Sequence, residues 1–236
     1  MRVDSQRALR FVGAMRSLVL LLAFATAALA EVPPELAAAL KTFRTDGPHG
    51  WAFTQTTAAE GKSLAERFDP AQRDLARWTL VQQDGHTPTV EQRSAYLDDM
   101  KHRAQGATAP KLTEQFDLAT LETVSVTPER ATYRCRLKPA ERGDETSAFL
   151  RVTLVVHKPS QTIESLEVAN TTGFSPTFGV KIAEMKTTMT YSLPTADRPS
   201  VPQKVVTRLR GQAFWFKSLD ADMLVTFTDY AKAGKQ

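Results

Sequence analysis

Apolar and polar residues alternate along most of the chain beyond residue 119, and this alternation predicts β-strands. It is clearest at residues 148–156, where Leu150, Val152 and Leu154 share one face and Arg151 and Thr153 lie on the other. The connections at 128–130, 159–161 and 218–222 are short, and they cannot hold the crossover helices of a parallel sheet. Consecutive strands should therefore run antiparallel, as a meander.

The predicted strands differ in length between the two halves of the chain. Short strands are expected at residues 51–53, 64–68 and 78–81, and longer ones at 122–127, 131–138, 148–158, 162–171, 177–193, 203–217 and 223–230. In the strand at 177–193 the apolar positions change from even numbers to odd numbers. A β-bulge near Ala183 and Glu184 would produce this change.

Two amphipathic helices are predicted before the long strands. At residues 35–43 Leu36, Leu40 and Phe43 fall on one helical face, and Gly47 and Pro48 end the helix. The second helix begins at a capping box formed by Thr89 and Gln92. Its apolar stripe contains Val90, Tyr96, Leu97, Met100 and Ala104, and Gly106 ends it.

Together these elements predict an α+β fold that is mainly β. The expected architecture is a curved antiparallel meander sheet, a half-barrel of about 9–11 strands, with two or three covering helices. Such a sheet would wrap around apolar contents, whether side chains, a helix or a ligand.

The first residues carry the pattern of a secretory signal peptide. Arg16 precedes an apolar run at 17–27, and Ala28-Leu29-Ala30 forms an A-x-A cleavage site. We expect cleavage after Ala30, a single β-rich domain at 31–236, and a periplasmic or secreted protein. No cysteine lies near the cleavage site, so no lipid anchor is expected, and no transmembrane segment is expected in the mature chain.

Charge and chemistry-bearing residues restrict the function classes. Residues 1–30 hold four Arg and one Asp, so the formal charge of +4 falls to +1 without them, which disfavours nucleic acid as a partner. Cys135 is the single cysteine and is expected to be an inert, inward-facing thiol. The four histidines have no metal-ligand spacing, and the common catalytic and phosphate-binding motifs are absent. No metal, cofactor or catalytic residue is predicted, and a binding protein is favoured over an enzyme.

Two groups of residues are candidates for binding. Phe214 and Phe216 lie opposite Trp215 in the predicted strand 203–217, so both faces of its end should be covered. An ordinary packed core explains the apolar residues of the long strands, and so does an adaptable apolar cavity. The expected cavity lining is Leu154, Phe178, Val180, Met185, Met189 and Trp215. The second group, Arg134, Arg136, Arg208 and Arg210, forms a basic stripe: either a solvated sheet face or a contact for phosphate head groups or an acidic partner.

The arrangement of these elements resembles the LolA/LolB superfamily of periplasmic lipoprotein carriers. The resemblance covers most of residues 31–236: a leading helix, short strands, a helical insert and a long meander that ends in Gly-Gln-Ala-Phe-Trp-Phe at 211–216. It implies a curved sheet closed by helices over an apolar cavity, and no functional residue is carried over. The segments at 67–70, 77–80, 84–85 and 88–89 are also similar to those of uncharacterised exported proteins of proteobacteria.

The sequence therefore favours an exported, carrier-like protein that binds a lipid or a lipoprotein acyl chain inside a curved sheet. A non-enzymatic interaction module for a cell-envelope protein is the second hypothesis. A hydrolase whose site is assembled in space is the third, because catalytic triads are recognised by geometry and not by order.

Overall fold

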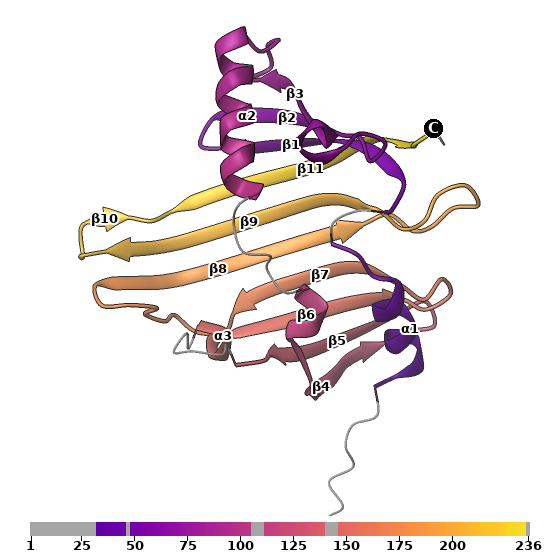
Figure 1. Cartoon of the computed structure of the whole chain (residues 1–236). Coiled ribbons are helices and arrows are strands. Elements are labelled where there is room, and N and C mark those ends of the chain that lie inside the picture. Colours follow the sequence, from indigo (N-terminus) through magenta and orange to yellow (C-terminus); the bar gives the residue numbers. More distant parts are fainter. Residues whose placement is uncertain (1–31, 46–47, 105–110, 140–145, 235–236) are drawn as a thin grey trace, which may run out of the picture. The chain divides into compact units, whose positions relative to one another are not determined.

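The computed structural model describes residues 32–45, 48–104, 111–139 and 146–234. These residues form one open antiparallel sheet of 11 strands with three α-helices (Figure 1). The predicted fold class is confirmed: the protein is mainly β, its neighbouring strands are antiparallel, and the sheet is not closed into a barrel. The predicted signal peptide lies outside the described residues.

The elements follow one another in a simple order. The helices are α1 (Pro34–Thr42), α2 (Val90–Ala104) and α3 (Thr146–Phe149), with short 3-10 helices η1 (Asp74–Arg77) and η2 (Leu112–Gln115). The strands are β1 (Trp51–Ala59), β2 (Lys62–Phe68), β3 (Trp78–Gln83), β4 (Phe116–Val126), β5 (Arg130–Leu137), β6 (Leu150–His157), β7 (Thr162–Asn170), β8 (Val180–Tyr191), β9 (Pro202–Ala213), β10 (Lys217–Ser218) and β11 (Ala221–Lys232).

The sheet consists of two meanders that meet at the last strand. Its order is β3-β2-β1-β11-β9-β8-β7-β6-β5-β4, with β10 paired to β9. The strands β4 to β9 follow the predicted meander, but β1 pairs with β11, so the first three strands join the end of the chain. The strands β3 and β4, which are consecutive in sequence, form opposite edges of the sheet.

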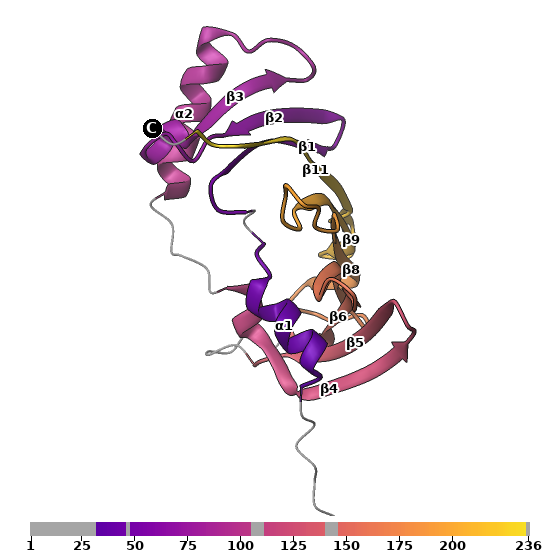
Figure 2. The ribbon, with the colours of Figure 1, turned by 90° about the vertical axis from the view of Figure 1, so that its right-hand side faces the viewer.

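Cross-strand pairing defines the two faces of the sheet, because residues that pair directly project to the same side. One row of pairs crosses eight strands and contains Tyr133, Leu154, Leu166, Met189, Val205, Val225, Thr57 and Leu64. We call the face that carries this row the inner face and the opposite one the outer face. Figure 2 shows the sheet bending around the side on which α1 lies.

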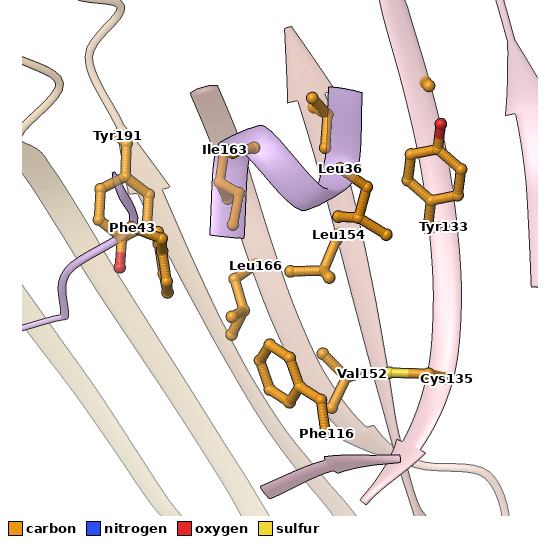
Figure 3. Close-up of a cluster of buried hydrophobic side chains, with 13 residues drawn as sticks. Leu36, Phe43, Phe116, Tyr133, Cys135, Val152, Leu154, Ile163, Leu166 and Tyr191 are labelled. Atoms are coloured by element: carbon orange, nitrogen blue, oxygen red, sulfur yellow. The ribbon is translucent and has the colours of Figure 1, made fainter. Parts of the chain in front are cut away.

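At one end of the inner face, α1 completes the main hydrophobic core. Leu36 is fully buried, and it lies with Leu154 and Leu166 of the sheet (Figure 3). The Phe43 ring meets the Tyr191 ring edge-on, with centroids 5.1 Å apart. The Tyr133 hydroxyl donates a hydrogen bond to Glu35 Oε1 at 2.8 Å. Burial and this bond raise the pKa of Tyr133 to about 12.

At the other end, α2 is joined to the sheet in a different way. The predicted capping box is present: the Gln92 side chain accepts from the Thr89 amide at 2.8 Å, and Thr89 Oγ1 accepts from the Gln92 amide at 3.2 Å. Of the predicted apolar stripe, Tyr96 is buried, whereas Leu97 remains 45% exposed. The Tyr96 hydroxyl donates to Oε1 of the buried Glu66 at 3.0 Å.

The structure confirms one local irregularity that the sequence predicts and corrects one strand end. The pairing of β8 with β9 shifts register between Ile182 and Glu184, where the bulge is expected. The strand predicted to reach Lys217 instead ends at Ala213, and Trp215 lies in the following turn. Because the aromatic residues there leave the sheet, the expectation that both faces of the strand end are covered is wrong.

Candidate functional site: the inner face between the two helices

The inner face is packed at its ends and more open across β8, β9 and β11. α1 packs mainly on β6 and β7, and α2 is joined to β2 through Glu66. Between them Met185, Leu209 and Met223 are partly exposed although they share the face that α1 covers. Met223 is 36% exposed, whereas Leu154 on the same face is fully buried. The central stretch therefore presents apolar side chains that no helix buries completely.

A pocket of about 410 Å³ lies beside the end of α1, and Tyr191 at the end of β8 and Pro202 at the start of β9 belong to its lining. Phe43, Ile163 and Tyr191 supply apolar walls, and Lys41 and Arg44 lie at its rim. Its volume falls within the range of small-molecule sites in proteins. An apolar floor beside exposed cations suits an amphiphile with a negatively charged head.

Tyr191 connects the pocket to the central stretch. Its hydroxyl donates to the thioether sulfur of Met189 at 3.8 Å, and Met189 lies in the row of inner-face residues that also contains Val205. Burial, followed by the charge of Tyr230, raises the pKa of Tyr191 well above its ordinary value. The hydroxyl is therefore neutral at physiological pH, and it gives this wall a polar point without a charge.

The six residues predicted to line a cavity do not lie together. Leu154 lies in the core beneath α1, whereas Met185 and Met189 lie on the inner face of β8. Val180 begins β8, and Phe178 and Trp215 are exposed in turns at one end of the sheet. The structure thus brings only the two methionines into the central stretch.

Other residues of the central stretch come from β9 and β11, which the predicted meander places in order beside β8 without giving their register. Val205 and Leu209 of β9 and Met223 and Val225 of β11 alternate correctly for an inner face. That alternation was visible in the sequence. The pairing register decides which face of these strands lies on the same side as Met189. The pattern of a single strand does not reveal that register.

The predicted basic stripe lies on the outer face, and acidic residues balance much of it. Arg210 makes two hydrogen bonds to Asp222 at 2.7 and 2.8 Å, and Arg208 lies 3.6 Å from the same carboxylate. The bonds from Arg210 lower the pKa of Asp222 below its ordinary value. Arg134 pairs with Glu122 at 3.5 Å, whereas Arg136 takes part in none of the ion pairs identified among the described residues. Exposed pairs of this kind contribute little to stability, and they reduce the net positive charge of the stripe.

The described residues offer little catalytic or metal-binding chemistry. They contain no group of three or more His, Cys, Asp or Glu side chains that could hold a metal ion. Cys135 is buried and unpaired, and burial together with the charge of Asp117 raises the pKa of its thiol to about 11. A thiol with that pKa stays protonated at neutral pH and is a poor nucleophile.

One serine–histidine contact is present, in the turn between β6 and β7. His157 Nδ1 lies 2.7 Å from Ser160 Oγ, which is itself 2.7 Å from Thr162 Oγ1. The nearby Glu164 carboxylate accepts two hydrogen bonds from Arg130, at 2.6 and 3.1 Å, and is thereby held away from the role of orienting a catalytic histidine. The contact is accounted for as a side-chain network that closes a hairpin turn.

The chain matches no known family of proteins, no curated protein and no solved structure. Within the described ranges, none of the helices is long and apolar enough to cross a membrane.

Proposed function

We propose that the protein binds an amphiphile with an acyl chain, such as a lipid or the acyl group of a lipoprotein, on the inner face of its sheet. The observation that carries the proposal is the partly exposed apolar stretch of β8, β9 and β11 on the same face as the pocket beside α1, whose lining includes Tyr191, the hydrogen-bond donor to Met189. Methionine side chains adapt to flexible chains, and each methylene moved out of water contributes about 0.8 kcal/mol.

The ligand would lie with its chain on the central stretch and its head near the rim of the pocket. Lys41 and Arg44 are exposed there and would attract a carboxylate or phosphate group. The resemblance to lipoprotein carriers that the sequence suggests points to the same ligand class. In this proposal α1 is a fixed wall, because its residues belong to the core.

Adjacent residues of β11 provide a matched test of which face binds. Met223 and Leu224 are each 36% exposed, but Met223 lies on the inner face and Leu224 on the outer face. We expect Met223→Asp to weaken binding of dansyl-labelled undecanoic acid about tenfold or more, because the lost apolar contact is worth at least ~1.5 kcal/mol. Leu224→Asp should leave binding unchanged.

The measurement is a fluorescence titration, with circular dichroism and thermal unfolding of both variants as folding controls. The proposal fails if the unaltered protein does not bind the probe saturably, or if Leu224→Asp weakens binding as much as Met223→Asp. A shallow depression is lined by Val206 and Leu224 and also by Met223, so the second result would move the site there.

We further propose that the protein is exported and acts in the periplasm or outside the cell. The support is the apolar segment at 17–27 and the Ala-Leu-Ala sequence that follows it. The expected result is that intact-mass spectrometry of protein expressed from the full-length gene in a Gram-negative bacterium, and recovered from its periplasm, gives the mass of a chain beginning at Glu31. A cytoplasmic protein that retains residues 1–30 would contradict this proposal without affecting ligand binding.

A further inference from the structure

Two neighbouring turns at one end of the sheet expose four aromatic side chains, which we call the aromatic turns. Phe178 precedes β8, and Phe214, Trp215 and Phe216 lie between β9 and β10. Phe178, Trp215 and Phe216 are 88%, 85% and 86% exposed. The two turns lie side by side because Val180 pairs with Ala213.

The backbone of these turns is fixed in a conformation that bulky residues rarely adopt. Phe214 and Trp215 have φ angles of 50° and 64°, in the left-handed region that favours glycine. The Phe214 amide donates to the carbonyl of Gly179 at 2.7 Å. Gly179 has a φ of 76°, and a Cβ at this position would approach the Phe214 ring to 2.8 Å. The close fit of Phe214 against Gly179 therefore holds the two turns together.

Packing within the described residues does not explain this arrangement. An unfavourable backbone conformation persists where the surrounding structure enforces it, and such sites are often functional. Here it points Trp215 and Phe216 into solvent, where they bury little surface against the sheet. A contiguous exposed apolar patch of this kind indicates contact with something outside the protein.

We propose that the aromatic turns insert into the interfacial layer of a bilayer that contains anionic lipid. Three aromatic side chains offer roughly 600 Å² at about 150–250 Å² each, which is less than the ~800 Å² per partner of a stable protein interface. Side chains at the tips of turns can enter a fluid interface without a complementary surface. Tryptophan is enriched at the level of the lipid head groups because its ring is amphipathic, and phenylalanine occurs with it on the buried face of helices that lie in this layer.

The charges beside the aromatic turns favour anionic head groups. Lys217 follows Phe216 directly, and Lys181 pairs across the strands with Gln212. None of the ion pairs identified among the described residues involves either lysine. Three acids lie on the same strands: Asp222 accepts from Arg210, Asp220 accepts from the Gly211 amide at 3.0 Å, and Glu184 pairs across the strands with Arg210. Lys181, Lys217, Arg208 and Arg210 outnumber these three carboxylates by one, so the net local charge is positive.

The test is binding of the whole mature chain to vesicles of phosphatidylglycerol and phosphatidylcholine, measured by co-sedimentation and by tryptophan fluorescence. Trp215 is far more exposed than the half-buried Trp51 and Trp78, so vesicles should shift the emission to shorter wavelength. Trp215→Phe should abolish most of that shift and preserve binding. We expect the triple variant Phe178→Ser, Trp215→Ser, Phe216→Ser to bind at least tenfold more weakly.

Val126→Ser is the matched control. Val126 is 56% exposed and lies at the end of the edge strand β4, away from the aromatic turns. It should bind vesicles like the unaltered protein. The proposal is overturned if the protein does not bind these vesicles, if the triple variant binds as well as the unaltered protein, or if pure phosphatidylcholine is bound equally well. It is also overturned if sedimentation shows a dimer that the triple variant abolishes, since the turns would then contact a second copy.

This proposal is independent of ligand binding on the inner face. The triple variant should bind dansyl-labelled undecanoic acid normally, and Met223→Asp should bind vesicles normally. Loss of both activities in both variants would indicate that the aromatic turns and the inner face form one site, which would overturn the separate role assigned to the turns.

Discussion

The two longer helices are held on the same face of one sheet by different means. α1 buries Leu36 and Ala39 completely or nearly so, and it belongs to the core with β5, β6 and β7. In the described part of α2, Tyr96 is the one buried side chain. Each helix is joined to the sheet by a tyrosine–glutamate hydrogen bond, but the roles are reversed: α1 supplies Glu35 and α2 supplies Tyr96.

This difference indicates which end of the inner face can open. Apolar burial holds α1 over many contacts, whereas α2 depends heavily on a polar link to the buried Glu66. Local opening takes place where few apolar contacts are buried. We therefore expect α2 to detach more readily than α1, and three experiments examine how each helix is held.

The largest difference in stability should come from replacing one leucine on each helix with alanine. Leu36→Ala creates a cavity in the core and should reduce the free energy of unfolding by about 2–5 kcal/mol. Leu97→Ala, on α2, should change it by less than ~0.5 kcal/mol, because Leu97 is largely solvated. Urea unfolding followed by circular dichroism measures both values. Equal losses would show that the two helices are equally embedded.

An intermediate effect should follow from Tyr96→Phe. This change removes the hydroxyl that donates to Glu66 and leaves a buried carboxylate oxygen without that donor. We expect the free energy of unfolding to fall by about 1–3 kcal/mol. Amide hydrogen exchange should become faster across α2 and stay unchanged across α1. Tyr133→Phe serves as the matched control, because it breaks the corresponding bond beneath α1 while the apolar packing of α1 remains. If exchange in α2 is unaffected, the polar link does not hold the helix.

The effect that is smallest near neutral pH should be a pH dependence specific to the α1 side, because it appears only in alkaline solution. The pKa of Tyr133 is raised from 10.0 to about 12, so the folded state retains a proton that the unfolded chain loses. The resulting stabilisation is complete below pH 10 and is lost as the pH rises from 10 to about 12. Tyr133→Phe should reduce this alkaline loss in urea unfolding. Burial also raises the pKa of Tyr191 and Tyr230, so the loss should not vanish.

Local sequence patterns predicted the elements whose cause is local. The alternation in β6, the bulge in β8 and the Thr89–Gln92 capping box all depend on neighbouring residues, and the structure contains each of them. β1 is longer than the sequence predicts. Residues 55–59 show no apolar alternation and are therefore not predicted as a strand, but in the structure they pair with both β2 and β11. Pairing with two neighbours extended a strand that its own residues do not indicate.

The remaining differences depend on backbone geometry and long-range register. Phe214, Trp215 and Phe216 have high strand propensity, and no glycine marks the left-handed turn that they form. Met185 and Met189 share a face because one strand contains both at an even spacing. Their neighbours on β9 and β11 could not be predicted from one strand, since the register that brings Met223 opposite Thr207 joins separate segments.

The pairing of the first strand with the last has a consequence for the order of folding. The hairpins from β4 to β9, and those from β1 to β3, need only partners close in the chain, so each set can form locally. By contrast, the open edge of β1 must wait for β11, which is distant in the sequence. Contacts between such distant segments slow folding. A chain that stops short of residue 221 would leave its entire N-terminal hairpin set with an unpaired edge, and that edge would favour aggregation.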